Sequence, residues 1–281
     1  MSVLRVQGNK CLLETIRFCH AHLSTTRPQV AIIHFSKVAA ALPQQVLAAT
    51  ISCRAKKAAF EHAGFRVNCL QLEETMEQGQ FESVLRDLKH DRATLGIIIQ
   101  RPIPAQFQRI CRQCQLVGDL DANASDFPSS ICAVAEATLR LIQRFAAGDQ
   151  VTVVGGRGHV GSAVVQGLNA LGISNQIIEQ GESFDILQKT PVVVSATGQP
   201  HILTARHIGE KHRLLIDIGF APVSVQPLVV YGDIDPKAYP AHSIVTPVPG
   251  GLGPLQISIL LERAARIVGL KKIPDWNIEL N

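Results

Sequence analysis

One stretch in the second half of the chain constrains the fold more than any other. Four β-branched residues, Val151–Val154, precede a cluster of glycines, and a helical pattern follows over 162–171. Gly156, Gly158 and Gly161 have the G-x-G-x-x-G spacing, which gives a tight turn, a close backbone approach to a pyrophosphate and a close helix–strand contact. The free N–H groups at the start of such a helix attract phosphate. The stretch therefore predicts a dinucleotide-binding βαβ unit.

The next predicted strand, 175–179, ends in an acidic residue, Glu179. It stands roughly twenty residues beyond the glycines, where dinucleotide-binding folds place an acid on the ribose diol. A carboxylate repels a 2′-phosphate, so Glu179 favours NAD over NADP. Arg157 in the glycine turn favours NADP, because a guanidinium can pair with that phosphate. Both cofactors stay open, with a preference for NAD.

The rest of the chain alternates short apolar segments with longer amphipathic ones, which predicts parallel sheets with helical crossovers. Besides 151–154 and 175–179, strands are predicted at 29–34, 66–72, 94–100, 192–195, 213–218 and 228–231. Helices are predicted at 44–63, 77–90, 107–114, 132–147, 162–171 and 255–268. The expected fold class is α/β, with an N-terminal α/β substrate domain and a C-terminal Rossmann-type domain flanking a cleft.

Composition excludes several kinds of function. The 281 residues carry a formal net charge of +4 and no dense run of Lys and Arg, which argues against nucleic acid as a partner. The apolar runs are too short to cross a bilayer, and the N-terminus does not resemble a signal peptide. Seven scattered cysteines predict reduced thiols and a cytoplasmic protein. The single Cys111-x-x-Cys114 pair is weak evidence for zinc, so no metal site is expected.

The segment 246–255, Thr-Pro-Val-Pro-Gly-Gly-Leu-Gly-Pro-Leu, closely resembles the signature of the bifunctional methylenetetrahydrofolate dehydrogenase/cyclohydrolase (FolD) family. Further segments resemble the family's motifs and stand in the same order: 96–104, 118–121, 196–200, 216–219 and 232–235. Together these segments cover most of the chain from about 51 to 268. The resemblance implies a tetrahydrofolate-bound substrate, a nicotinamide cofactor, and a homodimer formed through the cofactor domain.

The resemblance also implies catalytic residues in the N-terminal half. Aligned on Ala63-Gly64-Phe65, the family's catalytic lysine is Lys56, and the position of its tyrosine partner is occupied by Ser52. Residues four apart share one helix face, so both would face one site. The implied roles are proton handling by Lys56, support from Gln100 at a strand end, and anchoring of a pterin by Asp121. Partial burial of such a lysine would lower its pKa towards neutrality.

The remaining implied residues contact the cofactor or the substrate. The cofactor set is Gly155, Gly156, Arg157, Gly158, His159, Val160, Gly161, Glu179, Thr197, Gly198 and Phe220. The substrate set is Ile99, Arg101, Pro249, Gly250, Gly251, Leu252 and Gly253. Each of these residue types also has an ordinary structural explanation. A helical lysine is usually solvated, and a Pro-Gly-Gly string can be a simple bend.

Several positions depart from the family pattern. Ser52 replaces the tyrosine, Ala122 replaces a glycine, and 131–134 replaces Pro-Cys-Thr-Pro. The segment 34–50 lacks the usual Gly-Asp…Ala-Ser pattern. In the turn, the family's Gly-Arg-Ser-x-x-Val-Gly has become 155–161, Gly-Gly-Arg-Gly-His-Val-Gly. Cofactor binding is expected to be retained, whereas the substrate half is the more divergent.

The sequence therefore predicts NAD- or NADP-dependent oxidation of 5,10-methylenetetrahydrofolate, with hydrolysis to 10-formyltetrahydrofolate as a further activity. Two alternatives remain open: a dehydrogenase of the same fold acting on a non-folate substrate, and a catalytically silent paralogue that acts as a binding or regulatory subunit. The predicted domains are 1–147 with 254–281 for the substrate, and 148–253 for the cofactor.

Overall fold

The structure, a computed structural model, describes every residue except 1, 24–26, 114–117, 122–130, 271–274 and 277. The chain forms two compact units. Unit 1 consists of Met1–Leu12, Ile131–Gln256 and Trp276–Asn281. Unit 2 consists of Leu13–Ser130 and Ile257–Asp275. The functional domain boundaries expected from the sequence stay a prediction.

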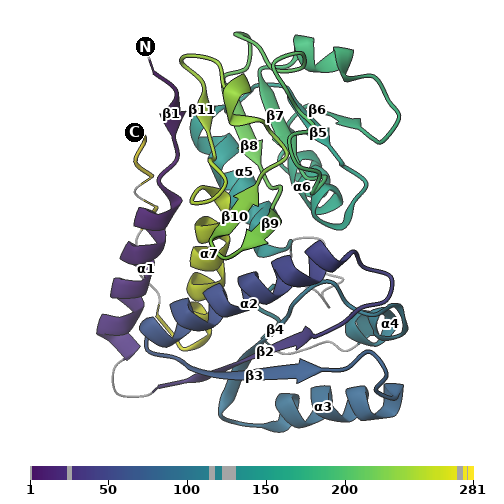
Figure 1. Cartoon of the computed structure of the whole chain (residues 1–281). Helices are drawn as coiled ribbons and strands as arrows, with labels where there is room; N and C mark the ends of the chain where they lie inside the picture. Colours follow the sequence, from purple (N-terminus) through teal and green to yellow (C-terminus); the bar gives the residue numbers. More distant parts are fainter. Residues whose placement is uncertain (1, 24–26, 114–117, 122–130, 271–274, 277) are drawn as a thin grey trace. The chain divides into compact units, whose positions relative to one another are not determined.

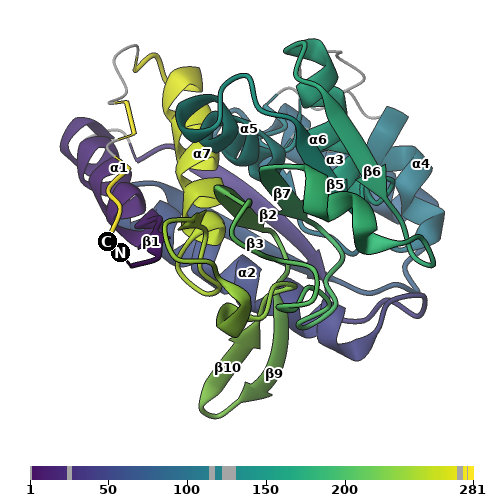
Figure 2. The same ribbon diagram turned by 90° about the horizontal axis from the view of Figure 1, so that it is seen from above.

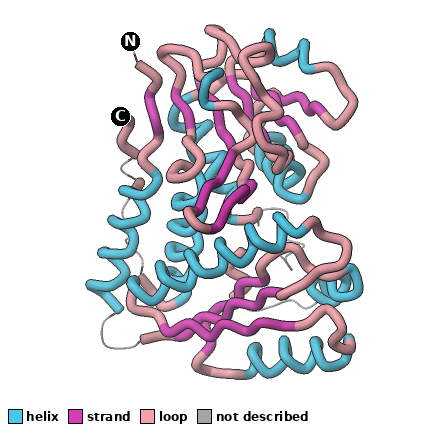
Figure 3. The backbone as a smooth tube through the Cα atoms, in the orientation of Figure 1, coloured by secondary structure: helices cyan, strands magenta, loops and turns pink. Residues whose placement is uncertain are grey.

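Unit 2 contains a three-stranded parallel sheet with the order β3 (Arg66–Leu72), β2 (Gln29–Phe35), β4 (Thr94–Ile99). Helix α2 (Pro43–His62) packs on one face and α3 (Gln78–His90) lies on the other, as Figures 1 and 3 show. Helix α4 (Ala105–Gln113) follows β4 and contacts α3. Helices on both faces account for the apolar strands of a parallel sheet.

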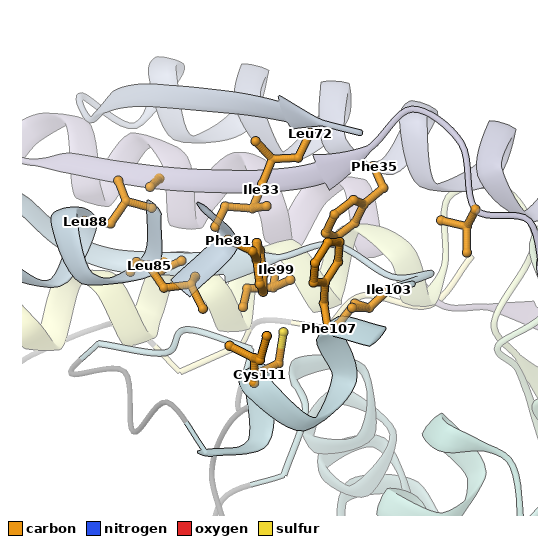
Figure 4. Close-up of a cluster of buried hydrophobic side chains, with 14 residues drawn as sticks. Ile33, Phe35, Leu72, Phe81, Leu85, Leu88, Ile99, Ile103, Phe107 and Cys111 are labelled. Carbon is orange, nitrogen blue, oxygen red and sulfur yellow. The ribbon is translucent and has the colours of Figure 1, made fainter. Parts of the chain in front are cut away.

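The core of unit 2 fills the space between the sheet and α3 and α4 (Figure 4). Phe35, Phe81 and Phe107 form its centre, with ring centroids 4.5 to 6.0 Å apart. Aliphatic residues from the strands and from α3 surround these rings, among them Ile33, Ile99 and Leu85. This packed core fixes the end of β4, and with it the position of the residue that follows, Gln100.

Unit 1 contains a six-stranded sheet in which every neighbouring pair is parallel. Its order is β1 (Leu4–Arg5), β11 (Ile244–Val245), β8 (Leu214–Asp217), β7 (Val192–Ser195), β5 (Val151–Val154), β6 (Asn175–Ile178). Helix α6 (His159–Ala170) follows β5 and packs on α5 (Ala133–Phe145). Gly167 permits that contact, since a Cβ there would stand 2.2 Å from a methyl carbon of Leu139.

A hairpin of β9 (Ala221–Val225) and β10 (Leu228–Tyr231) extends from unit 1, away from the strands of its sheet (Figure 2). It is antiparallel, unlike the parallel pairing predicted for the strands. The segment at 228–231 is thus a strand as expected, but its partner β9 was not predicted. Two short 3₁₀ helices, Phe184–Lys189 and Pro236–Ala238, complete the unit.

Helix α1 (Gly8–Leu23) was not predicted from the sequence, and the short strands β1 and β11 were also missed. The buried face of α1 is carried by Cys11, Thr15, Cys19 and Leu23, which are spaced every four residues. Cysteine and threonine are weak hydrophobic signals, so the helical period was hidden. Helix α7 (Leu252–Ile267) begins three residues before the predicted start at 255.

The α/β fold class with a Rossmann-type C-terminal unit is confirmed, and the bounds of the predicted elements agree with the observed ones to within a few residues. Within the described part of the chain, no helix is both long enough and apolar enough to span a membrane.

Candidate functional site

Lys56 lies on the buried face of α2. The buried positions of this helix include Ala49, Cys53, Lys56 and Phe60, whose spacing of three and four residues defines one stripe facing the sheet. Lys56 is only 1% exposed, so its charged end is inside unit 2 and not in solvent. Lysine is almost never buried without partners. The solvated lysine that a helix normally carries is therefore ruled out at this position.

Two side chains hold the Lys56 ammonium. Its Nζ donates to Ser52 Oγ over 2.8 Å and to Gln100 Oε1 over 2.7 Å. Ser52 is one helical turn earlier on α2, as predicted from the spacing of four. Gln100 comes from a different element, immediately after β4, where its backbone N–H donates to Ile33 O. Its side-chain amide nitrogen donates to Arg101 O over 3.1 Å, which orients the oxygen towards Lys56.

Asp121 reaches the same site along the edge of the sheet. The segment before it pairs with β4, because Ile97 N donates to Gly118 O and Leu120 N donates to Ile97 O. Gly118 is required there: its φ is +82° and a Cβ would stand 2.3 Å from Leu95 O. Asp121 N donates to the Asp119 carboxylate over 3.1 Å, which closes a tight turn. Ala122, the next residue, lies outside the described residues.

Burial and charge act on Lys56 in opposite directions. Burial lowers the pKa of Lys56, while the negative charge of Asp121, and more weakly Cys53, raises it; the net direction is downward. Desolvation wins because the ammonium has lost its water and its two close partners are neutral. A lysine in this condition releases and recovers a proton more easily than one in solvent, so it can act as a general acid or base.

The glycine turn in unit 1 has the geometry of a phosphate-binding turn. Gly155 has a φ of +78°, and Gly158 N donates back to Gly155 O over 3.2 Å. A Cβ on Gly161 would stand 2.0 Å from Gly155 O, and one on Gly156 would stand 2.7 Å from an Ile177 side-chain carbon. Side chains at these two positions would collide with the turn backbone and with Ile177, respectively. Helix α6 begins at His159, so its free N–H groups lie beside the turn, next to Val160 and Gly161.

Glu179 contacts this turn directly. One of its carboxylate oxygens accepts a hydrogen bond from Arg157 N over 2.6 Å. Its own backbone N–H donates to the Glu182 carboxylate over 2.8 Å, so two acidic side chains gather at the end of β6. Glu179 therefore lies beside the glycine turn, and Glu182 places a second carboxylate near it. The ribose-binding role of Glu179 stays a prediction.

The other expected cofactor residues lie in the same unit. Thr197 follows β7, and its backbone N–H donates to the Asp233 carboxylate. Gly198 adopts a φ of +67°, and Phe220 is partly exposed between β8 and β9. Thr197 is close to the glycine turn, because a Cβ on Gly155 would stand 3.3 Å from Thr197 Cγ2. The glycine turn after β5 and the Thr197 loop after β7 therefore lie along the same edge of the sheet.

The predicted substrate residues fall into two groups. Ile99 and Arg101 flank Gln100 in unit 2, and Ile99 is buried. The segment 249–253 belongs to unit 1, where it forms a turn closed by a bond from Gly251 N to Pro247 O, and Leu252 and Gly253 begin α7. Gly250 has a φ of +101°. Pro249 and its neighbours therefore pack as a structural turn, and a substrate role for either group stays a prediction.

Two buried acids received no role from the sequence. Asp217 at the end of β8 and Asp233 after β10 are 2% and 0% exposed, respectively. Both stood in matched motifs, but a carboxylate beside a glycine is also typical of a turn. The local signal for Asp217 is its position at the end of a strand that is otherwise fully apolar.

Fold and glycine turn together define a dinucleotide-binding α/β protein. The sequence also matches the family model described as tetrahydrofolate dehydrogenase/cyclohydrolase, NAD(P)-binding domain, over residues 128–272, just over half of the chain. The chain therefore belongs to the tetrahydrofolate dehydrogenase/cyclohydrolase family.

Curated relatives extend the similarity beyond that domain. The bifunctional protein FolD of Thermomicrobium roseum is 25% identical over 91% of this chain and 97% of its own length. The bifunctional protein FolD of Mycoplasmopsis synoviae is 26% identical over 73% of this chain and 79% of its own length.

Solved structures share the fold. The Trypanosoma brucei methylenetetrahydrofolate dehydrogenase-cyclohydrolase, complexed with NADP and an inhibitor, aligns over 95% of this chain and 97% of its own, with a TM-score of 0.78 and 22% identity. The NAD-dependent 5,10-methylenetetrahydrofolate dehydrogenase of Saccharomyces cerevisiae aligns over 95% and 98%, with a TM-score of 0.66 and 15% identity.

Proposed function

We propose that this chain oxidises 5,10-methylenetetrahydrofolate to 5,10-methenyltetrahydrofolate with a nicotinamide cofactor, and hydrolyses the product to 10-formyltetrahydrofolate. The observation that carries the proposal is the buried Lys56 bound to Gln100 and Ser52, with Asp121 as its nearby charge. Family membership, and the activities named for the relatives, supply the reaction.

The residues of unit 1 fit a dinucleotide. A Cβ on Gly161 or Gly156 would collide with Gly155 O or with Ile177, so glycine at both positions lets the turn close tightly, and α6 begins beside it. Backbone N–H groups of the turn and helix would hold the pyrophosphate. When bound, the nicotinamide supplies an acceptor for the hydride of the methylene carbon.

Lys56 then handles the proton of the hydrolytic step. Water adds to the methenyl carbon and loses one proton, which the neutral Lys56 amine accepts. The hydroxyl of this adduct then loses its proton and becomes the formyl carbonyl as the bond from that carbon to N5 breaks. N5 takes a proton from the Lys56 ammonium, and the formyl group remains on N10. One proton is released overall. The lowered pKa of Lys56 suits it to both transfers.

Ser52 differs from the tyrosine of the family, but it still provides a hydrogen-bond partner for Lys56. Its hydroxyl accepts from Lys56 over 2.8 Å, so the amine keeps a partner on α2 where the family has a tyrosine. The aromatic surface of the tyrosine is missing. We expect this loss to weaken binding of the flat pterin more than it alters proton transfer at Lys56.

NAD is the proposed cofactor. Glu179 occupies Arg157 N with its carboxylate, and Glu182 adds a second negative charge at the same strand end. A 2′-phosphate placed there would meet two carboxylates, whereas a ribose diol would donate to one of them. The Arg157 side chain lowers this discrimination but does not remove it.

A homodimer through unit 1 is part of the proposal, and the hairpin supplies its surface. Val223, Val225 and Leu228 are each more than half exposed, and Tyr231 is 40% exposed. In the described residues the hairpin strands pair only with each other, so their outer edges are open. A second copy related by a two-fold axis would cover the same apolar side chains on both chains. The predicted cytoplasmic location is retained with this proposal.

The deciding experiment is turnover of 5,10-methylenetetrahydrofolate, with NAD and NADP supplied in parallel and absorbance used to follow reduced nicotinamide and the methenyl product. We expect reduced nicotinamide with NAD, followed by decay of the methenyl absorbance faster than in buffer. Binding of NAD without turnover would contradict the proposal and favour a non-folate dehydrogenase or a silent paralogue.

A further inference from the structure

Two buried carboxylates, Asp217 and Asp233, lie at the edge of the unit 1 sheet that carries the glycine turn. Asp217 is the last residue of β8, and Asp233 follows β10 sixteen residues later. Strands β5, β7 and β8 are parallel neighbours, so the loops after them meet at one edge. Burying a carboxylate is costly unless it is well hydrogen-bonded. Two of them at one place therefore call for an explanation.

Asp233 holds the loop that follows β7. Its Oδ2 accepts from Ser195 Oγ over 2.8 Å and from Thr197 N over 2.7 Å. The first bond comes from the last residue of the strand and the second from two residues later, so the carboxylate fixes the direction in which the chain leaves the sheet. Thr197 Oγ1 then accepts from Gln199 N over 3.1 Å, which continues the ordered turn.

That loop is in contact with the glycine turn. A Cβ on Gly155 would stand 2.9 Å from Ala196 O and 3.3 Å from Thr197 Cγ2. Ala196 N also donates to Val154 O, the last residue of β5. The Thr197 loop therefore lies directly beside Gly155, where only a glycine leaves room for it. Asp233 therefore holds the loop that packs beside the glycine turn.

The carboxylate of Asp217 fixes the backbone around Asp233. Asp217 Oδ1 accepts from Asp233 N over 3.0 Å and from Gly219 N over 2.9 Å, and Oδ2 accepts from Ile234 N over 2.9 Å. The approach is so close that a Cβ on Gly232 would stand 2.1 Å from Asp217 Oδ2. Three backbone donors thus fix the carboxylate of Asp217 and the segment that carries Asp233.

We propose that Asp233 is a positioning residue for dinucleotide binding: it fixes the Thr197 loop against Gly155 so that the glycine turn keeps its phosphate-binding shape, and Asp217 fixes Asp233. The inference rests on the proposed function only in requiring that unit 1 binds a nicotinamide dinucleotide. It assigns no contact between either carboxylate and the cofactor. The two hydrogen bonds that hold the loop, from Ser195 Oγ and Thr197 N, both go to Asp233 Oδ2.

The test compares Asp233→Asn with Asp233→Ala, using direct NAD binding in the absence of folate. An asparagine oxygen can still accept from Ser195 and Thr197, so we expect its dissociation constant for NAD to stay within about threefold of the wild type. Alanine removes the acceptor oxygen and with it both hydrogen bonds, so we expect weakening of at least about tenfold. Asp235→Asn, a partly exposed acid two residues away, should leave binding unchanged and serves as the matched control.

Hydrogen exchange separates positioning from general loss of stability. Thr197 N–H is donated to a buried carboxylate, so it should exchange slowly in the wild type and in Asp233→Asn. In Asp233→Ala, exchange should rise in peptides covering 155–158 and 196–199 while the strand peptides of the sheet stay protected. If Asp233→Ala does not fold, Ser195→Ala, which removes a single donor, should show the same local pattern with a smaller loss of affinity.

The outcomes are distinct. A folded Asp233→Ala that binds NAD like the wild type overturns the inference and leaves the proposed function standing. Equal weakening in Asp233→Asn and Asp233→Ala also overturns it, because the acceptor oxygen would then be irrelevant. Uniformly raised exchange across unit 1 in every weakened variant reduces the role of Asp233 to general stability and overturns the inference. A wild-type chain that binds neither NAD nor NADP overturns both this inference and the proposed function.

Discussion

Lys56 Nζ donates to Gln100 Oε1 over 2.7 Å, although the two residues are 44 positions apart and come from a helix and a strand end. The contact joins the buried face of α2 to the edge of the sheet in unit 2. It gives a buried amine an acceptor that carries no charge, which is the condition under which burial lowers the pKa of lysine.

Replacing Lys56 by methionine should remove hydrolysis of the methenyl product and spare NAD binding. We expect a loss of roughly 100- to 10,000-fold in the hydrolysis rate, the usual contribution of a general acid or base. Stability should change little, because removing a buried charge offsets the acceptor left unpaired at Gln100. Lys57→Met is the matched control, since Lys57 is exposed and forms a surface ion pair with Glu61. An unchanged rate in Lys56→Met would remove Lys56 from the mechanism.

Replacing Asp121 by asparagine should shift the pH profile of hydrolysis. The charge of Asp121 raises the pKa of Lys56 against the larger effect of burial, so its removal lowers that pKa further. The neutral amine is the base, and its fraction rises with pH. The rising limb should therefore move to lower pH in Asp121→Asn. Hydrolysis rates measured over a pH series test this expectation. A shift of the rising limb to higher pH would contradict the assignment of neutral Lys56 as the base.

The same lowered pKa has a consequence for stability. The pKa of Lys56 in the folded chain lies below its unfolded value, so protonation opposes folding. While Lys56 is neutral in both states, its burial carries no charge penalty. The corresponding stability is fully present above the unfolded pKa of Lys56, and it is lost as pH falls through the folded pKa. Methionine does not titrate, so the free energy of unfolding of Lys56→Met should vary less with pH between the unfolded and folded pKa values of Lys56. Chemical denaturation of both proteins across the range tests the expectation.

Replacing Glu179 by glutamine should reduce discrimination against NADP. The neutral amide keeps an acceptor for Arg157 N but no longer repels a 2′-phosphate, so we expect the ratio of NADP to NAD affinities to rise by on the order of tenfold. Glu210→Gln, an exposed acid elsewhere in unit 1, is the charge control. Dissociation constants for both cofactors give the ratio, and an unchanged ratio would exclude Glu179 from cofactor selection.

Replacing Gly161 by alanine should abolish dinucleotide binding. The new Cβ would stand 2.0 Å from Gly155 O, and because the obstacle is backbone, the turn itself must shift. We expect a destabilisation of about 1–3 kcal/mol and no measurable NAD binding. Gly209→Ala is the control, since a Cβ there meets nothing within 4 Å. Wild-type NAD affinity in Gly161→Ala would contradict the phosphate-binding role of the turn.

A charge on the hairpin should dissociate the proposed homodimer. Val225→Asp places a carboxylate among exposed apolar residues that a second copy would cover, and the desolvation cost opposes association. Light scattering coupled to size exclusion should show the wild type at twice the mass of the variant. Leu171→Asp, an exposed leucine outside the hairpin, should keep the wild-type mass. Equal masses for wild type and Val225→Asp would rule out this surface.

The sequence predicted the glycine turn and its flanking elements because the signals there are local. A strand of β-branched residues, three glycines and a helix follow one another, and two of the glycines, Gly156 and Gly161, are needed for a close approach that the structure shows. The spacing of four between Ser52 and Lys56 likewise depends only on the helix. The contact with Gln100 required a tertiary arrangement, and only the family resemblance suggested it.

Other features depended on packing that no local pattern reveals. Helix α1 hides its period behind cysteine and threonine, and β1 and β11 have two residues each, too few for any alternation. Strand β9 begins Ala-Pro, and proline is typical of edge strands and turns, which concealed the hairpin. Burial of Asp217 and Asp233 became visible only when the loops after β8 and β10 were placed side by side.

The bonds of Asp217 have one more consequence. The same carboxylate ties Gly219, before the hairpin, to Asp233 and Ile234, after it, while Asp233 ties the hairpin base to Thr197. The hairpin base and the loop beside the glycine turn therefore share one set of hydrogen bonds. By thermodynamic linkage, if association of two hairpins tightens NAD binding by some factor, NAD must tighten association by the same factor. The two carboxylates would then be the coupling element between self-association and cofactor affinity.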